Sequence, residues 1–286
     1  MDRHSARDER KPLSTLLRVG AYAAAALAVA WLATNRNVEG QGGRPSTSGA
    51  SAQLVDDLIV ANKILSNEGI LDGLGHISVR HDQNPNRFLL SRDLAPLLVT
   101  AGDLVEYDLE GAPVNANAPP GYQERFIHAA IYKARPDVKS VIHGHAPSLL
   151  TFADSSVPLR PMYHMAAFLA EGVPNYEIRK VEGSTGMLVN SLKLGTALAQ
   201  TLGDKPLALM RGHGVVVVGP NIPEAVSRAI FADTNAKIQL QAVALGGTIS
   251  YLSGVDTTPI PPTGQQTTGA PYPRSWPYWK QRALGR

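Results

Sequence analysis

The chain has 286 residues, enough for one large α/β domain or two small ones. Residues 1–36 carry six basic and three acidic side chains, so they account for the formal charge of +3 and leave the rest near neutral. A nucleic-acid-binding domain would show a basic stripe on its folded part, so no nucleic-acid partner is expected. The lack of cysteine excludes disulfides and thiolate ligands, and any metal site must use His, Asp or Glu.

The N-terminal residues bear on location. Residues 1–18 are polar and basic, and residues 19–34 follow without a single charge. A basic segment before a short apolar segment is typical of an export signal, although this run falls short of a span of about 20 residues. We predict that residues 1–36 are an export signal or an N-terminal membrane anchor, with the folded part periplasmic or otherwise outside the cytoplasm. An Ala-rich soluble helix is the alternative.

Composition divides the remaining chain into three parts. Residues 37–52 are rich in Gly, Ser, Gln and Pro and predict a flexible linker. Residues 53–256 alternate apolar patterns with turns and predict the folded domain. Residues 257–286 form a Pro/Gly-rich tail with Trp276 and Trp279, which either wraps a neighbouring surface or is loose.

The folded part mixes helical and extended patterns along one unit without an internal repeat. In chain order the sequence predicts a helix at 53–69, strands at 77–80, 88–91 and 104–109, a helix at 123–134, a strand at 138–145, a helix starting at 148–152, a strand at 176–180, a helix at 191–202, strands at 207–210 and 215–218, and a helix at 223–245. A three-layer α/β/α domain is the economical interpretation of this order.

Three histidines are placed as a metal site would require. His143 and His145 stand two apart in a predicted strand, so their side chains point to the same face. Gly144 between them leaves room for another backbone or a substrate. His213 lies between two glycines in the turn joining two apolar strands. Three His with an open position is a catalytic metal geometry, whereas ordinary polar residues at strand ends are the alternative.

A carboxylate lies beside this pattern. Glu124 begins the predicted helix before the His-containing strand, and His128 follows one turn later on the same helical face. Glu124 could be a fourth ligand or a general base at a metal ion. The alternative is that it only complements the positive end of the helix dipole.

Four segments together resemble the class II aldolase/adducin superfamily. They are Glu124-Arg-Phe-Ile-His-Ala-Ala-Ile-Tyr132, Arg135-Pro-Asp-Val138, Val141-Ile-His-Gly-His145 and Arg211-Gly-His-Gly-Val215. The resemblance implies an α/β/α fold with a mainly antiparallel central sheet, usually in a homotetramer with sites between subunits. It implies that residues 53–256 are the catalytic domain.

The resemblance also assigns roles to residues of this chain. It implies that His143, His145 and His213 bind a divalent metal and that Glu124 is the catalytic acid/base. Zn²⁺ is the first expectation for the ion, with Mn²⁺, Co²⁺ and Fe²⁺ as alternatives.

The departures from the family pattern concern phosphate binding. Sugar-phosphate aldolases of the family carry a Gly-Asn-x-Ser loop, a Thr-Pro-x-Gly turn and a Ser-Ser pair before the catalytic Glu. Here these positions read Gly75-His-Ile-Ser78, Ser91-Arg-Asp-Leu-Ala-Pro96 and Tyr122-Gln-Glu124. All three elements are altered, so a non-phosphorylated small-molecule substrate is expected.

The remaining pattern is more similar to a branch of the family that decarboxylates hydroxylated aromatic or heteroaromatic acids. The candidate substrate-binding residues are His76, Arg80, Ser91, Arg92, Tyr122, His164 and Arg179. An Arg could hold a substrate carboxylate in a bidentate pair, His76 could contact substrate or donate a proton, and Tyr122 could donate to an enolate. For each residue a purely structural role is the alternative.

The sequence therefore predicts a metal-dependent carbon–carbon lyase, acting by aldol cleavage or decarboxylation on a small hydroxy or oxo acid that could be aromatic. A dehydratase using the same metal and Glu is an alternative. A second alternative, of another class, is a metal-free adducin-like interaction module.

Overall fold

Strand β7 (Gly214–Gly219) contains four consecutive valines, and their alternation shows how the sheet is covered. The side chains of Val215 and Val217 enter one apolar core, while those of Val216 and Val218 enter a second core on the opposite face. Both faces of this strand are buried. A sheet buried on both faces must lie between two layers of helices.

The computed structural model describes residues 49–183, 186–257 and 274–285. Seven strands form one sheet in the order β3-β2-β1-β4-β7-β6-β5, antiparallel except for the β5–β6 pair. The strands other than β7 are β1 (His76–Arg80), β2 (Arg87–Ser91), β3 (Leu104–Asp108), β4 (Ser140–Gly144), β5 (Asn175–Tyr176) and β6 (Leu207–Met210). The expected mainly antiparallel sheet is confirmed.

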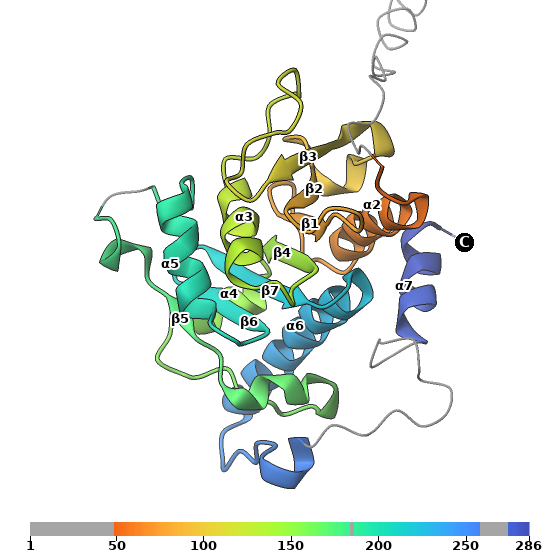
Figure 1. Ribbon diagram of the computed structural model, residues 1–286. Helices are drawn as coiled ribbons and strands as arrows, with labels where there is room; N and C mark the ends of the chain where they lie inside the picture. Colours follow the sequence, from red (N-terminus) through yellow and green to blue (C-terminus); the bar gives the residue numbers. More distant parts are fainter. Residues whose placement is uncertain (1–48, 184–185, 258–273, 286) are drawn as a thin grey trace, which may run out of the picture. The chain divides into compact units, whose positions relative to one another are not determined.

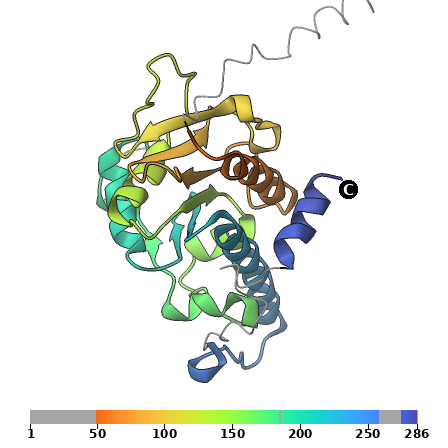
Figure 2. The same ribbon diagram turned by 45° about the vertical axis from the view of Figure 1, so that its right-hand side comes forward.

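Helices cover the two faces unequally (Figures 1 and 2). Helices α3 (Arg125–Ala134) and α5 (Leu192–Leu202) pack on one face, against the core that contains Val216 and Val218. Helices α2 (Ala52–Asn67), α4 (Pro147–Ala153) and α6 (Ile222–Leu245) pack on the other face. The predicted three-layer α/β/α architecture is confirmed.

Side-chain caps begin several of these helices where the sequence places them. Ser51 and Ser191 accept the backbone N–H groups of Leu54 and Leu194 at the starts of α2 and α5, and Asn221 caps α6 in the same way. Short 3₁₀ turns complete the fold: η2 (Pro96–Leu98), η3 (Ala101–Asp103), η4 (His164–Glu171), η5 (Ile178–Lys180) and η6 (Gly254–Thr257).

The predicted strand at 176–180 is wrong over most of its length. Strand β5 ends at Tyr176, and the chain then turns into η5. The side chain of Glu177 accepts the backbone N–H of Arg179, which begins the 3₁₀ turn and ends the strand.

The described part of the tail is a helix, α7 (Ser275–Ala283), which packs against α2. Trp279 enters the core beside Phe231, with ring centroids 5.6 Å apart, and Arg282 pairs with Glu68 at 2.8 Å. Of the two expectations for the tail, docking on a neighbouring surface holds for this segment.

The predicted export segment (residues 1–36) and the linker up to residue 48 lie outside the described residues. Among the described residues, no helix combines the length and apolarity needed to cross a membrane.

Candidate active site

His143 and His145 lie at the end of β4, on the face of the sheet that α3 covers. The strand register places His143 opposite His76 of β1 and Val216 of β7. His145 follows the last residue of the strand, and its Nε2 atom lies 3.1 Å from that of His143. The predicted convergence of the two imidazoles is confirmed.

His213 reaches the same point from the turn between β6 and β7. Close backbone packing requires glycine around it. A Cβ on Gly214 would lie 2.3 Å from the carbonyl oxygen of Gly144, and one on Gly144 would lie 2.5 Å from that of Ile70. The glycine between the two strand histidines therefore admits another backbone, one of the two possibilities predicted.

Glu124 completes the cluster from the N-cap position of α3. Its Oε1 accepts the backbone N–H of Val189 at 2.8 Å, which fixes the carboxylate. Its Oε2 lies 3.4 Å from Nε2 of His143 and 3.3 Å from Nε2 of His213. The four potential ligand atoms of this cluster all lie within 4.8 Å of one another.

Hydrogen bonds on the far sides of two imidazoles determine which nitrogen carries a lone pair. Nδ1 of His143 lies 3.1 Å from the Val215 carbonyl oxygen, and Nδ1 of His145 lies 3.1 Å from the Asp72 carboxylate. A carbonyl or carboxylate oxygen can only accept, so each Nδ1 carries the proton. The two Nε2 lone pairs then face each other across 3.1 Å, an arrangement that a shared cation stabilises. The residues present therefore fit a divalent metal.

The charge states of Glu124 and His143 suit the same role, whereas His213 must give up a proton to bind a metal. Burial favours protonated Glu124, but the imidazoles of His143 and His213 outweigh burial and hold the pKa of its carboxyl group well below its usual range. Burial lowers the pKa of His143 and favours the neutral imidazole that a metal binds. Burial would also lower the pKa of His213, but contact with Glu124 reverses this and raises it.

Asp72 contacts a member of the cluster and was not among the residues predicted from the sequence. Its carboxylate bonds to Nδ1 of His145 and also accepts the backbone N–H groups of Leu74 and Gly75. It therefore orients a candidate ligand and raises its basicity, as carboxylates behind metal-bound histidines do. The only local signal is an Asp at the start of a Gly-rich turn, which does not reveal a partner 73 residues away.

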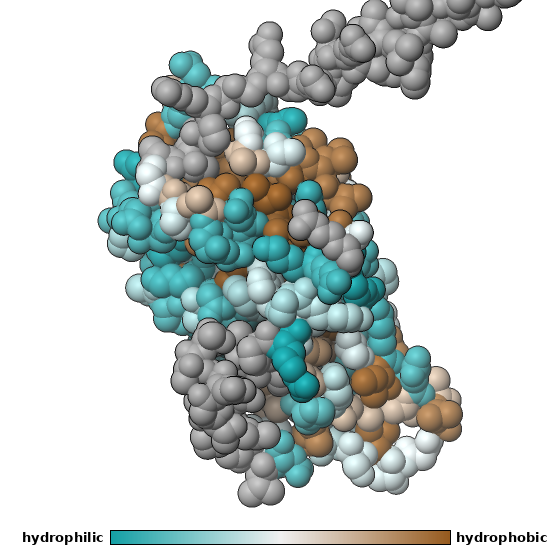
Figure 3. Space-filling model, turned by 90° about the vertical axis from the view of Figure 1, so that its right-hand side faces the viewer, coloured by the Kyte–Doolittle hydropathy of each residue, from teal (hydrophilic) through white to brown (hydrophobic). Residues whose placement is uncertain are grey.

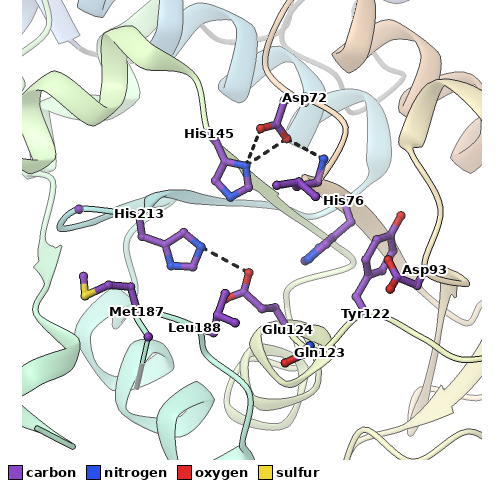
Figure 4. Close-up of a pocket in the computed structure, with 13 residues that line it drawn as sticks. Asp72, His76, Asp93, Tyr122, Gln123, Glu124, His145, Met187, Leu188 and His213 are labelled. Atoms are coloured by element: carbon purple, nitrogen blue, oxygen red, sulfur yellow. Dashed lines mark hydrogen bonds and ion pairs between the residues drawn. The ribbon is translucent and has the colours of Figure 1, made fainter. Parts of the chain in front are cut away.

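A pocket of about 450 Å³ opens onto the cluster (Figure 4). It is lined by Asp72, Leu74, His76, Asp93, Tyr122, Gln123, Glu124, His145, Gly186, Met187, Leu188, Gly212 and His213. Three of these side chains are carboxylates, and the described lining contains no Lys or Arg. The volume suits a small-molecule ligand.

Residues 56–240 match the family described as "Class II Aldolase and Adducin N-terminal domain". This match covers more than half of the chain. The chain belongs to this family.

Individual relatives agree with this assignment. The chain is 42% identical over 195 residues to "Decarboxylase tropJ" of Talaromyces stipitatus, covering 64% of this chain and 73% of that protein. It is 31% identical over 224 residues to "3,4-dihydroxyphthalate decarboxylase" of Arthrobacter keyseri, covering 72% of this chain and 86% of that protein. Among solved structures, L-fuculose 1-phosphate aldolase from Glaciozyma antarctica is 25% identical with a TM-score of 0.63, covering 82% of this chain and 90% of that one.

The class II aldolase family membership, its lyase relatives and the His/Glu cluster identify this protein as an enzyme of the lyase type. The adducin-like alternative requires an incomplete ligand set, and here four ligand atoms converge.

Of the predicted substrate-binding residues, His76 and Tyr122 line the pocket beside the cluster. Their rings are in contact, with centroids 4.5 Å apart. The Tyr122 hydroxyl donates to the Leu94 carbonyl and lies 3.1 Å from Ser91 Oγ, so it points away from the metal cluster. Ser91 is buried behind Tyr122 and supports it.

The predicted arginines lie elsewhere. Arg80 is buried and donates to the backbone carbonyls of Tyr132, Pro85, Val138 and Arg135. Arg92 pairs with Asp103 at 2.7 Å, and Arg179 pairs with Glu177 at 2.7 Å. The structure does not bring these three guanidinium groups to the pocket.

His164 also lies outside the pocket lining. It begins η4, and its ring contacts that of Tyr163 with centroids 5.2 Å apart. Within this chain it is not brought together with the metal cluster.

Proposed function

We propose that this protein is a divalent-metal-dependent decarboxylase of a small, non-phosphorylated hydroxy-aromatic acid, with Zn²⁺ as its ion. The observation that carries this proposal is the convergence of His143, His145, His213 and Glu124 in one cluster. The substrate class comes from relatives named as decarboxylases, one of them of 3,4-dihydroxyphthalate. Their similarity covers most of their own length.

The three imidazoles would hold the ion through their Nε2 atoms. When bound, the ion would stabilise negative charge on substrate oxygens as a Lewis acid. Glu124 is ionised and its Oε2 faces the cluster, so it can accept the proton of a substrate hydroxyl beside the carboxylate. As the bond to the carboxylate carbon breaks and CO₂ leaves, that proton passes from Glu124 to the ring carbon. The phenolate product then takes a proton from solvent.

The charge of the pocket supports a substrate with little negative charge beyond one carboxylate. Asp72, Asp93 and Glu124 line it without a compensating Lys or Arg among the described lining residues. Even beside a divalent ion these three carboxylates leave a net negative charge, which disfavours a phosphate dianion. His76 also occupies the position at which sugar-phosphate aldolases of the family have Asn in a phosphate loop.

Product analysis tests this proposal. The metal-loaded full chain would be incubated with 2-hydroxybenzoates and 2,3-dihydroxybenzoates, and with 4-hydroxybenzoate as the control without an adjacent hydroxyl. CO₂ release from the first two only, lost in Glu124→Gln, is the expected result. Aldehyde release from hydroxy acids, or loss of water without loss of carbon, would replace decarboxylation with aldol cleavage or dehydration at the same site.

Two further proposals concern location and assembly. We propose that residues 1–36 export or anchor the protein, which fractionation of cells expressing the full chain would test.

We also propose a homotetramer in which a neighbour borders the pocket. Leu74 at the pocket rim is 73% exposed, and hydrophobic side chains gather on the upper part of the face in Figure 3. Light scattering on the purified protein would measure the assembly.

A further inference from the structure

A line of four buried side chains runs from the pocket into the space between β1 and α3. Nδ1 of His76 lies 2.7 Å from Nε2 of His128, and Nδ1 of His128 lies 2.6 Å from Ser78 Oγ. Ser78 Oγ lies 2.8 Å from the hydroxyl of Tyr132. None of the four is more than 1% exposed, so water does not compete for these bonds.

The protons along this line can be assigned from its far end. Burial raises the pKa of Tyr132, so it remains a phenol with one proton to donate. Within the described part of the chain, the phenol is hydrogen-bonded to no acceptor other than Ser78 Oγ. Tyr132 therefore donates to Ser78, and Ser78 donates to Nδ1 of His128.

The same order continues to the pocket. Ser78 donates to Nδ1 of His128, so this nitrogen carries a lone pair and the ring is a neutral imidazole with a single proton. Because Nδ1 of His128 accepts, that proton lies on Nε2 and is donated to Nδ1 of His76. A neutral His76 must then carry its own proton on Nε2, the ring nitrogen not engaged in this line. Figure 4 shows the His76 ring reaching toward Glu124 in the pocket.

We infer that Tyr132, Ser78 and His128 lock His76 in its Nε2–H tautomer, so that His76 presents a fixed N–H donor to an anionic oxygen of the substrate. The Tyr122 ring, 4.5 Å away between centroids, supports His76 on another side. His76 is the binding group, and the other three are positioning residues. The donor selects a substrate with an acceptor oxygen at this point and disfavours one with a donor there.

This inference rests on the proposed function for the identity of the oxygen, the phenolate or carboxylate of a hydroxy-aromatic acid. The tautomer itself does not depend on activity. A preset donor is advantageous because a freely rotating or tautomerising group would lose binding energy each time it was fixed.

The tautomer can be measured directly by ¹⁵N NMR on the full chain with labelled histidine, with His76 assigned from a His76→Gln variant. The expected result is a protonated Nε2 and an unprotonated Nδ1 on His76. Finding the proton on Nδ1 would overturn the inference, even if the protein is an active decarboxylase. Finding it on Nε2 in a protein that decarboxylates nothing would refute the proposed function alone.

Variants test the consequence for substrate. Ser78→Ala and Tyr132→Phe interrupt the line without removing His76. We expect each to raise KM for a hydroxy-aromatic acid by about 10- to 100-fold with unchanged metal content, and to shift the His76 ¹⁵N signals toward a tautomer mixture. Ser140→Ala is the matched control, because its buried hydroxyl donates to the Ser78 carbonyl and not to the line.

A substitution at His76 separates a donor role from a packing role. The side-chain amide of Gln can place an N–H where Nε2 lies, so His76→Gln should retain part of the substrate affinity that His76→Leu loses. Equal KM values for the two variants, with both folded and metal-loaded, would contradict the donor role.

Discussion

At the scale of single residues, Asp72 orients a candidate metal ligand through its bond to His145, and Arg80 holds buried backbone carbonyl groups. The metal cluster was predictable because the His-x-His spacing fixes two side chains on one face and the family motifs add His213 and Glu124. The role of Asp72 depends on a turn that returns to His145 from a distant part of the chain. Arg80 was predicted to bind substrate because an Arg can hold a substrate carboxylate in a bidentate pair. Its guanidinium group instead donates hydrogen bonds to backbone carbonyls that come together only in the folded chain.

Asp72→Asn should weaken metal binding by about 10- to 100-fold, because the amide accepts less strongly from Nδ1 of His145 and lowers the basicity of Nε2. Competition with a fluorescent chelator measures the change. Asp93→Asn is the matched control, since Asp93 lines the pocket but makes no described contact with a ligand His. Equal effects of the two variants would mean that only the net charge of the pocket matters.

Arg80→Met should lower the free energy of unfolding by about 3 kcal/mol or more, because it leaves several buried carbonyl groups without their charged donor. Urea unfolding measures the loss. Arg92→Met, with a side chain 40% exposed and a single carboxylate partner, should change the stability by about 1 kcal/mol or less. A stable Arg80→Met variant with a raised KM would restore the substrate-binding role predicted from sequence.

At the scale of elements, the sequence was informative wherever a local pattern decides the structure. The valine run of β7 and the apolar spacing in α2 and α5 are such patterns, and those elements lie where predicted. Helix α7 could not be predicted in the same way. It follows a Pro/Gly-rich stretch of the tail, and its helix is stabilised by packing of Trp279 against Phe231 rather than by periodicity.

Trp279→Ala should therefore release α7 from the domain. Trp279 is 6% exposed, and removing a buried Trp side chain costs about 3–5 kcal/mol. Hydrogen exchange should show loss of protection in α7 while the sheet remains protected, because a terminal helix can open by itself. Tyr278→Ala, at a position 56% exposed on the same helix, should leave protection unchanged. Uniform loss of protection across the sheet would show that α7 is integral to the core.

At the scale of the whole molecule, the sheet is buried on both faces by helices. This packing brings four candidate ligands from three separate segments of the chain to one point. The α/β/α architecture follows from the alternation of strands and helices, whereas location and assembly depend on segments and surfaces for which the sequence gives only expectations. A bound ion would link β4, the β6–β7 turn and the start of α3, which supply the candidate ligands. Metal binding should thus stabilise the domain as one unit.

Added Zn²⁺ at about 100 times its dissociation constant should stabilise the domain by about 2.7 kcal/mol. For a domain of this size, each kcal/mol raises the melting temperature by about 2–4 °C, so the expected rise is about 5–11 °C. Scanning calorimetry with and without a chelator measures the shift. The His143→Ala/His145→Ala variant should show no shift, and an equal shift in that variant would place the ion elsewhere.

Elemental analysis of the purified full chain, beside the His143→Ala/His145→Ala variant, tests the metal cluster most directly. The cluster of Nε2 atoms predicts about one divalent ion per chain in the parent and none in the double variant. A parent that binds no ion after addition of Zn²⁺, Mn²⁺ or Co²⁺, or a double variant that keeps its ion, would contradict metal-dependent catalysis at this site.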